Sequence, residues 1–194
     1  MPARLEAITG SMFCGKSEEL VRRLVRARYA EKRILVVAPK LDTRSARNIF
    51  TLIAEHDKLK TYDRLKTASI ANLRELTCLI EEGRPDVVAL DEVQFFSKSL
   101  PTALSRILAD KSPGDFTIIV SGLDQDSFGK GFGPMPEILA RANDVQKLTA
   151  ICNACKRESA YYTYRLPGGS REQKEIGDTD RYQARCLKCW QLPE

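Results

Sequence analysis

The stretch GSMFCGKS, residues 10–17, constrains the fold more than any other part of this chain. Its glycines, Gly10 and Gly15, accept backbone angles that other residues avoid, so consecutive amide groups can turn toward one anion. The apolar run LEAIT (5–9) comes directly before it, and an amphipathic, helix-like pattern begins near Ser17. A strand, a glycine-rich loop and a helix in this order predict a loop that binds the phosphates of a nucleoside triphosphate.

The motif also carries side chains suited to that ligand. Lys16 would bring a positive charge to the β- and γ-phosphates, and the Ser17 hydroxyl would ligate Mg²⁺. The alternative is a glycine-rich turn that merely resembles the motif, and the strand and helix on either side argue against it. The predicted phosphate-binding residues of this stretch are Gly10, Ser11, Met12, Phe13, Cys14, Gly15, Lys16 and Ser17.

Strand-like apolar runs alternate with helix-like periodicity along most of the chain. The predicted strands cover 5–9, 33–39, 86–90, 116–122 and 145–151, and the predicted helices begin near residue 17 and cover 69–83, 99–110 and 137–144. Residues 40–66 fit no pattern well enough to be assigned. Such alternation predicts an α/β fold of the P-loop NTPase kind, with a mostly parallel sheet and helices on both faces. Ligands of these sheets bind at the carboxyl ends of the strands.

Two adjacent carboxylates, Asp91 and Glu92, follow the buried run VVAL. At the end of a strand neighbouring the glycine-rich loop, Asp91 would hold Mg²⁺ through its waters. Glu92 could take a proton from the group that attacks the γ-phosphate. If water attacks, the protein is an ATPase; if a substrate hydroxyl attacks, it is a kinase. The acid pair does not choose between them, and a solvated strand end is the alternative for Glu92.

Four of the six cysteines form two CxxC pairs, CNAC and CLKC, which are separated by 30 residues. Paired CxxC motifs suit tetrahedral zinc, and four cysteines leave no position for substrate, so the predicted ion is structural. Disulfides or free thiols are the alternatives. The predicted division is a nucleotide-binding domain, 1–148, and a small zinc-tied domain, 149–194. The zinc ligands would be Cys152, Cys155, Cys186 and Cys189.

Composition narrows the class of protein. The 194 residues are 43% hydrophobic and carry a net charge of +5, and their apolar runs are strand-length rather than membrane-spanning. The first ten residues lack a signal-peptide core. A cytoplasmic enzyme without a membrane partner is therefore expected.

Taken together, the motifs resemble the zinc-containing thymidine kinases over essentially the full length of the chain. The stretches that carry the resemblance are GSMFCGKS, DTR (42–44), DEVQFF (91–96), GLDQDSFGKGFG (122–133), KLTAICNAC (147–155) and IGDTDRYQARCLKC (176–189). The resemblance implies ATP-dependent phosphorylation of the thymidine 5′-hydroxyl, giving thymidine monophosphate for DNA synthesis. Glu92 would be the general base and Asp91 would serve Mg²⁺. The ATP site would also include Arg44, Asp91, Glu92, Val93 and Gln94.

The resemblance further implies that thymine lies between the main domain and a lasso-like loop rooted at the zinc. The implied substrate-binding residues are Met12, Phe95, Leu123, Phe128, Phe132, Thr163, Glu175, Ile176, Gly177 and Tyr182. Gly168 and Gly169 would let the loop close and exclude water. The sequence departs from the family in four respects: Phe128 is shifted by one position, Gly131 replaces a proline, ESAYYTYRL is one residue longer, and Glu175 replaces an apolar residue.

The family is generally tetrameric and inhibited by thymidine triphosphate, so a homotetramer and this inhibitor are expected here, without a nucleic-acid partner. A nucleic-acid-dependent ATPase, whose zinc module binds DNA, is the main alternative. Residues 150–193 hold eight Lys/Arg and five Asp/Glu, a mild basic excess. A kinase of another nucleoside, such as deoxyuridine, is the third possibility.

Overall fold

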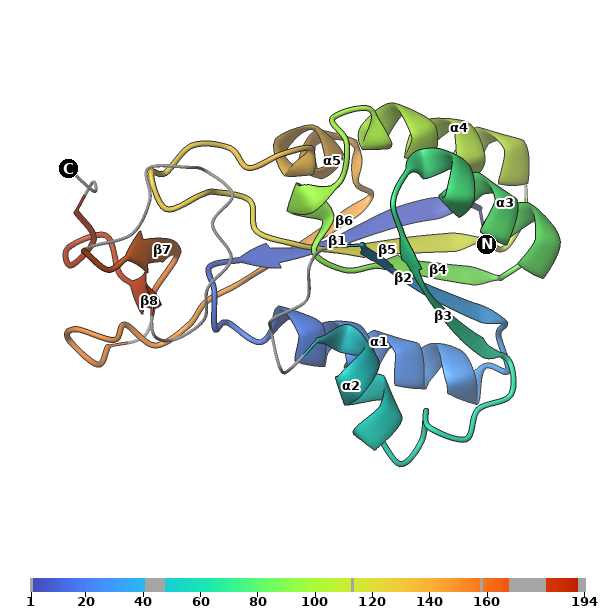
Figure 1. Ribbon diagram of the computed structural model, residues 1–194, viewed down its shortest axis with the longest axis horizontal. Helices are drawn as coiled ribbons and strands as arrows, with labels where there is room; N and C mark the ends of the chain where they lie inside the picture. Colours follow the sequence, from blue (N-terminus) through green and yellow to red (C-terminus); the bar gives the residue numbers. More distant parts are fainter. Residues whose placement is uncertain (1, 41–47, 113, 158, 168–180, 192–194) are drawn as a thin grey trace.

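The computed structural model describes residues 2–40, 48–112, 114–157, 159–167 and 181–191. Six strands form one sheet in the order β3–β2–β4–β5–β1–β6, and every pairing within it is parallel (Figure 1). The strands are β1 Arg4–Gly10, β2 Ile34–Pro39, β3 Leu65–Ile70, β4 Val87–Leu90, β5 Thr117–Ser121 and β6 Asp144–Leu148. The predicted α/β fold with a mostly parallel sheet is confirmed.

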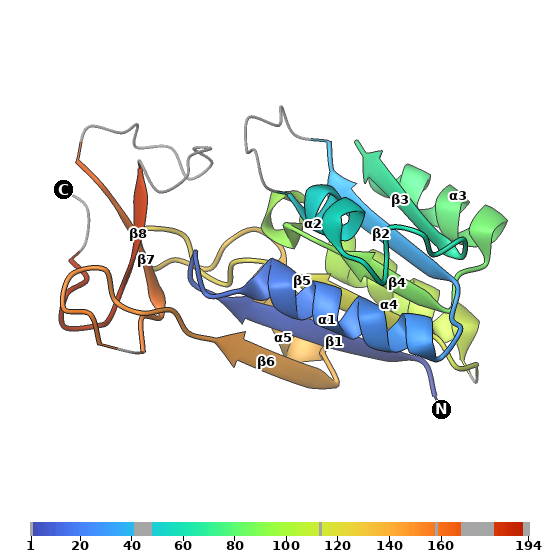
Figure 2. The ribbon, with the colours of Figure 1, turned by 90° about the horizontal axis from the view of Figure 1, so that it is seen from below.

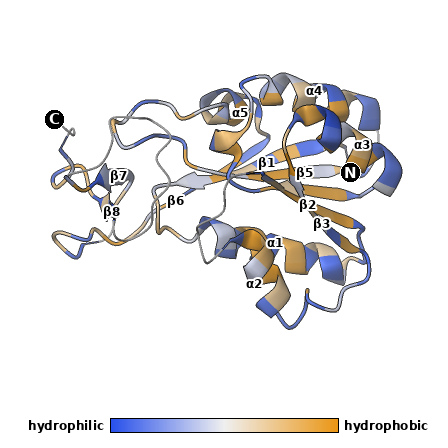
Figure 3. Ribbon diagram, viewed as in Figure 1, coloured by the Kyte–Doolittle hydropathy of each residue, from blue (hydrophilic) through white to orange (hydrophobic). Residues whose placement is uncertain are grey.

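Helices cover both faces of this sheet, as predicted. The helices are α1 Lys16–Tyr29, α2 Ile49–Glu55, α3 Leu73–Gly83, α4 Leu100–Lys111 and α5 Met135–Arg141, with a short 3-10 helix, η1 Val93–Phe95. One core cluster joins α3, α4 and α5 to the sheet, and a second joins α1 and α2 to the opposite face. The apolar sides of the helices face the strands in Figure 3. Because both faces are covered, the central strands β2 and β4 are continuous apolar runs rather than alternating ones.

The prediction lacked α2 and β3 of the main domain, as well as η1 and the two strands Tyr162–Arg165 and Tyr182–Arg185. Helix α2 lies within the unassigned region 40–66, and β3 begins at its end. The predicted helix over 69–83 was also wrong at its start, because Ile70 ends β3 and the helix begins at Leu73. Asn72 caps that helix: its side chain accepts a hydrogen bond from the Glu75 amide. A period of 3.6 residues happens to place Ile70 in line with the buried helical residues, so the pattern extended the helix too far.

Beyond the carboxyl ends of β1 and β6 lies a small antiparallel pair, β7 Tyr162–Arg165 and β8 Tyr182–Arg185 (Figure 2). A bridge between Ala150 and Ala160 connects it to the chain that leaves β6. Thus the described residues from 149 onward, here called the C-terminal module, lie at the carboxyl ends of the parallel strands, where a ligand is expected. Within the described ranges, every helix is too short or too polar to cross a membrane.

Candidate functional site

The glycine-rich loop, residues 10–17, follows β1 and leads into α1. Gly10 has φ +137°, and a Cβ atom built there would lie 2.3 Å from the Leu148 carbonyl oxygen. Gly15 has φ +84° and caps the N-terminus of α1 without a side-chain hydrogen bond. Both positions therefore favour glycine, and the first amides of α1 remain available to an anion.

Lys16 points back into the loop that precedes it. Its ammonium donates hydrogen bonds to the carbonyl oxygens of Ser11 at 2.7 Å and Gly10 at 3.4 Å. These carbonyls hold the positive charge over the loop, in the position from which it can reach a phosphate group. Binding a triphosphate would exchange these neutral acceptors for charged oxygens, which accept stronger hydrogen bonds.

The Ser17 hydroxyl and the Asp91 carboxylate meet although their strands are not neighbours. The prediction of a neighbouring strand was wrong: β5 lies between β1 and β4. The Ser17 Oγ atom nevertheless lies 3.4 Å from Asp91 Oδ2. Burial, and next the negative charge of Glu92, raise the pKa of Asp91 to about 7. A buried carboxylate beside a hydroxyl is a suitable partner for a divalent cation.

Glu92 stands at the turn from β4 into η1. Its backbone is left-handed, with φ +53°, which redirects the chain after the strand. Its carboxylate is half-buried and accepts a hydrogen bond from the side-chain amide of Gln94. Glu92 thus lies next to Asp91 at the carboxyl end of β4, where the sequence predicted it.

Residues 122–133 form a compact loop after β5. The Asp126 carboxylate accepts hydrogen bonds from the amides of Phe128 and Lys130, both at 2.9 Å, and so fixes the tip of the loop. At its base, Phe132 packs edge-to-face against Phe95, with ring centroids 5.5 Å apart. The structure therefore brings two of the predicted base-pocket aromatic residues into contact.

The alternation of β7 settles which of two adjacent residues faces the glycine-rich loop. Thr163 is 4% exposed, and its hydroxyl accepts a hydrogen bond from the Met12 amide at 3.1 Å. Tyr162 lies on the other face of the strand and stacks on Trp190, with ring centroids 4.7 Å apart. Thr163 is thus the residue placed beside the predicted site, together with Met12.

Arg165 lies on the same buried face as Thr163. Its guanidinium lies 5.4 Å from the ring centroid of Phe128 and 5.6 Å from that of Tyr182. Both rings belong to the predicted substrate-binding set, and cation–π contacts of this length are attractive. Arg165 thus brings the shifted Phe128 into contact with the C-terminal module.

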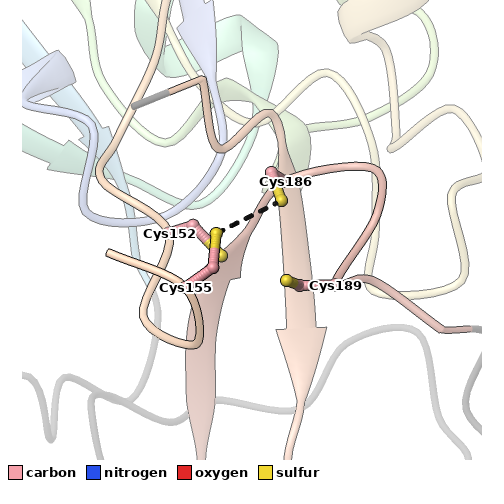
Figure 4. Close-up of side chains that lie close together, drawn as sticks. All are labelled: Cys152, Cys155, Cys186 and Cys189. Atoms are coloured by element: carbon pink, nitrogen blue, oxygen red, sulfur yellow. Dashed lines mark hydrogen bonds between the residues drawn. The ribbon is translucent and has the colours of Figure 1, made fainter. Parts of the chain in front are cut away.

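The four predicted zinc ligands form one cluster between the CNAC turn, β8 and the CLKC turn (Figure 4). Their sulfur atoms all lie within 4.8 Å of one another, and the Cys155 and Cys186 sulfurs are 3.8 Å apart. Thiolates on a tetrahedral zinc ion are separated by about 3.8 Å, since each Zn–S bond is about 2.3 Å long. All six cysteines are free thiols, so the structure gives no support to the disulfide alternative.

The cluster shifts the pKa values of two of its thiols in opposite directions: hydrogen bonds with Cys186, and next burial, raise the pKa of Cys189 to about 12, whereas that of Cys152 is lowered. Burial acts to raise the pKa of Cys152, but hydrogen bonds from the backbone amides of Cys155 and Cys186 outweigh it and lower the pKa to about 6. The Cys152 thiol is therefore largely ionised at neutral pH, and the thiolate is the form that binds metal. The donor set fits a structural zinc ion.

The C-terminal module is tied directly to the glycine-rich loop. The buried Ser11 hydroxyl donates a hydrogen bond to the Ala160 carbonyl oxygen at 2.9 Å. Cys14 packs against the core of the module, which includes Cys152. Burial raises the pKa of the Cys14 thiol even though Lys16 is near, so this side chain acts as a neutral packing group.

Several predicted residues lie outside the described residues. They are Arg44, Glu175, Ile176 and Gly177, together with the predicted hinge residues Gly168 and Gly169. Two open cavities, of about 400 and 510 Å³, lie elsewhere: one is lined by Arg33, Arg84 and Lys111 among others, the other by β3 and α3. Neither includes a predicted site residue.

Comparison with known proteins identifies the family. The thymidine kinase family model matches residues 3–190. A thymidine kinase of Mycoplasma mobile is 39% identical over 95% of this chain and 86% of its own length. Those of Mesomycoplasma hyopneumoniae and a Rhodothermus species are 37% and 36% identical, over 97% of this chain and 95% and 82% of their own lengths. The chain belongs to the thymidine kinase family. It is accordingly a kinase. Asp91 and Glu92 alone left open whether water or a substrate hydroxyl attacks the γ-phosphate, and family membership supports the substrate.

Three contacts of this thymidine kinase family member were not foreseen. They are the Gln94–Glu92 hydrogen bond, the Arg165 contacts with aromatic rings, and an ion pair of 2.6 Å between Lys147 and the buried Asp124. The Arg165 contacts could have been inferred from a strand pattern, because residues 163 and 165 lie on the same face of a strand. The Lys147–Asp124 ion pair joins two different segments, so no local pattern contains it. Glu92 and Gln94 are only two residues apart, but their contact depends on the left-handed backbone of Glu92, which the sequence does not show.

Proposed function

We propose that this protein transfers the γ-phosphoryl group of ATP to the 5′-hydroxyl of thymidine, giving thymidine monophosphate. The proposal rests on one observation above all: at the carboxyl end of the sheet, Lys16 and Ser17 from the loop after β1 meet Asp91 and Glu92 from the end of β4. A chain of the thymidine kinase family that carries this set of residues has what in-line phosphoryl transfer requires.

Each of these residues would have a distinct role in phosphoryl transfer. The loop amides and Lys16 bind and orient the triphosphate, and Glu92 accepts the proton of the 5′-hydroxyl. Ser17 and Asp91 would hold Mg²⁺, whose charge offsets that of the phosphates when it is bound. The raised pKa of Asp91 supports this assignment, since a buried carboxylate without a cation resists ionisation.

The base of the substrate would lie among the residues described above on both sides of the site. Phe95 comes from η1, Leu123 and Phe132 come from the 122–133 loop, and Thr163 and Tyr182 come from the C-terminal module. A flat apolar base is well suited to aromatic walls with few polar partners. We therefore also propose the division into residues 1–148, which bind ATP, and 149–194, which close on the nucleoside around a structural zinc ion.

Three further parts of the proposal rest on the family resemblance. Thymidine triphosphate would inhibit the enzyme, because one molecule could occupy the base pocket and the phosphate loop together. The protein would be a cytoplasmic homotetramer. Sedimentation of the purified protein, with and without thymidine triphosphate, would test the assembly.

The replacement Glu92→Gln tests the proposed base. Its amide cannot take the proton, so kcat for thymidine phosphorylation is expected to fall by about 10²- to 10⁴-fold, while the KM for ATP changes little. Glu82→Gln on the exposed side of α3 is the matched control and should leave both constants unchanged. A Glu92→Gln enzyme that retains wild-type kcat would contradict the assignment.

A further inference from the structure

We infer that Gln94 is a positioning residue, whose buried side-chain amide orients the Glu92 carboxylate and joins it to the start of the 122–133 loop. This inference rests on the proposed function, because it requires Glu92 to be the base. The family resemblance placed Gln94 in the ATP site together with its neighbours, but gave its side chain no role toward Glu92.

The orientation of the Gln94 amide is determined by its second partner. Gln94 is fully buried, and its Oε1 atom accepts a hydrogen bond from the Leu123 backbone amide at 3.0 Å. A backbone N–H can only donate, so the oxygen of the side chain must face Leu123. The nitrogen therefore faces Glu92, and it donates to Glu92 Oε2. Both ends of the amide are used, as burial requires.

The Glu92 carboxylate depends on this contact for its direction. Among the described residues, Gln94 is the one hydrogen-bond partner of that carboxylate. The left-handed backbone of Glu92 directs the chain away from β4. Two residues later, within the 3-10 helix η1, the side-chain amide of Gln94 contacts the Glu92 carboxylate. A carboxyl group on two methylenes would otherwise populate several rotamers, few of which face a substrate hydroxyl.

The same amide connects the base to the loop predicted to hold the nucleoside. Leu123 is one of the predicted pocket residues, and Gly122 before it packs closely on Gln94: a Cβ atom built on Gly122 would lie 2.6 Å from Gln94 Oε1. Hence a displacement of the start of the loop would displace the Gln94 amide and, with it, the carboxylate. Nucleoside binding and placement of the base are thereby coupled through one side chain.

A simpler role is that Gln94 only fills the core and stabilises the loop. The two roles differ in one measurable respect. A residue that acts through Glu92 loses its effect on kcat when Glu92 can no longer serve as base, whereas a structural residue has the same effect in both backgrounds.

The experiment is a double-mutant cycle of full-length protein with Glu92→Gln and Gln94→Met, in which labelled thymidine is used so that slow rates can be measured. Gln94→Met keeps the length of the side chain and removes both hydrogen bonds. Gln94→Glu is the second variant, because it keeps an oxygen for the Leu123 amide and replaces the donor to Glu92 with a carboxylate, whose charge would repel that of Glu92. Gln146→Met on β6 is the control, as Gln146 contacts Arg23 at 2.7 Å, away from the site.

With Glu92 present, we expect each Gln94 variant to lower kcat by about 10- to 100-fold with little change in the KM for ATP. In the Glu92→Gln background the same changes should cost less than about threefold. Gln146→Met should leave kcat unchanged.

Equal losses in both backgrounds, or wild-type kcat in both Gln94 variants, would overturn the inference while leaving the proposed function intact. Wild-type kcat in Glu92→Gln alone would overturn the proposed base and the inference together. If Gln94→Met does not fold, the Gln94→Glu cycle decides between the same outcomes.

Discussion

At the scale of single residues, the two carboxylates at the end of β4 have opposite environments. Asp91 is 3% exposed, and burial together with the charge of Glu92 raises its pKa to about 7, whereas Glu92 is half-buried and hydrogen-bonded to an amide. The sequence shows only that the two acids are adjacent. The different roles proposed for them rest on their surroundings, since Asp91 faces the Ser17 hydroxyl and Glu92 faces Gln94.

The raised pKa of Asp91 predicts how stability depends on pH in the absence of metal and nucleotide. In the unfolded chain this carboxyl releases its proton near pH 4, whereas in the folded protein it retains the proton to about pH 7. The folded state binds more protons in this window, so the free energy of unfolding should fall as the pH rises from about 4 to 7.

Asp91→Asn removes this contribution. At pH 8 the variant should be more stable than the wild type by about 1–3 kcal/mol, and at pH 4 the difference should nearly vanish. Urea unfolding at both pH values measures it. A variant that is less stable at pH 8 would show that the buried carboxylate is compensated within the protein itself.

At the scale of elements, the sequence predicted five strands of the main sheet, β1, β2, β4, β5 and β6, and missed β3 and the C-terminal pair β7–β8. In β3 only Ile70 is buried, because the strand lies at the edge of the sheet, and its polar residues give no apolar run. The loop and the cysteine turns were predicted because each is a local motif. The Arg165 contacts and the Asp124–Lys147 ion pair were not, since each depends on how distant elements pack.

The C-terminal module offers a prediction at this scale. Cys189→Ser removes one thiolate from the cluster, so purified protein should lose stoichiometric zinc, and its Tm should fall by about 5–10 °C. Cys78→Ser on α3 is the matched control, because Cys78 is exposed and lies outside the cluster. Zinc content by mass spectrometry and a thermal scan are the measurements. Equal zinc content in both variants would refute the four-cysteine site.

At the scale of the whole molecule, all the candidate residues described lie at one end of the parallel sheet. At this end lie the loop after β1, the carboxylates after β4 and the 122–133 loop after β5. The C-terminal module lies beyond the same end (Figure 2). Hydrogen bonds from Ser11 and Met12 join the glycine-rich loop to that module. The fold thus places the proposed phosphate site beside a module that would enclose the acceptor and exclude water from the reaction.

The most direct test of this account follows the γ-phosphoryl group itself. Protein with Mg²⁺ and γ-labelled ATP would be incubated with thymidine, deoxycytidine or single-stranded DNA, and the labelled product identified. The account predicts label on the 5′-oxygen of thymidine, little on deoxycytidine, and ADP release that depends on thymidine. Release of labelled phosphate that is stimulated by DNA and indifferent to thymidine would contradict it, and Glu92 would then activate water in an ATPase.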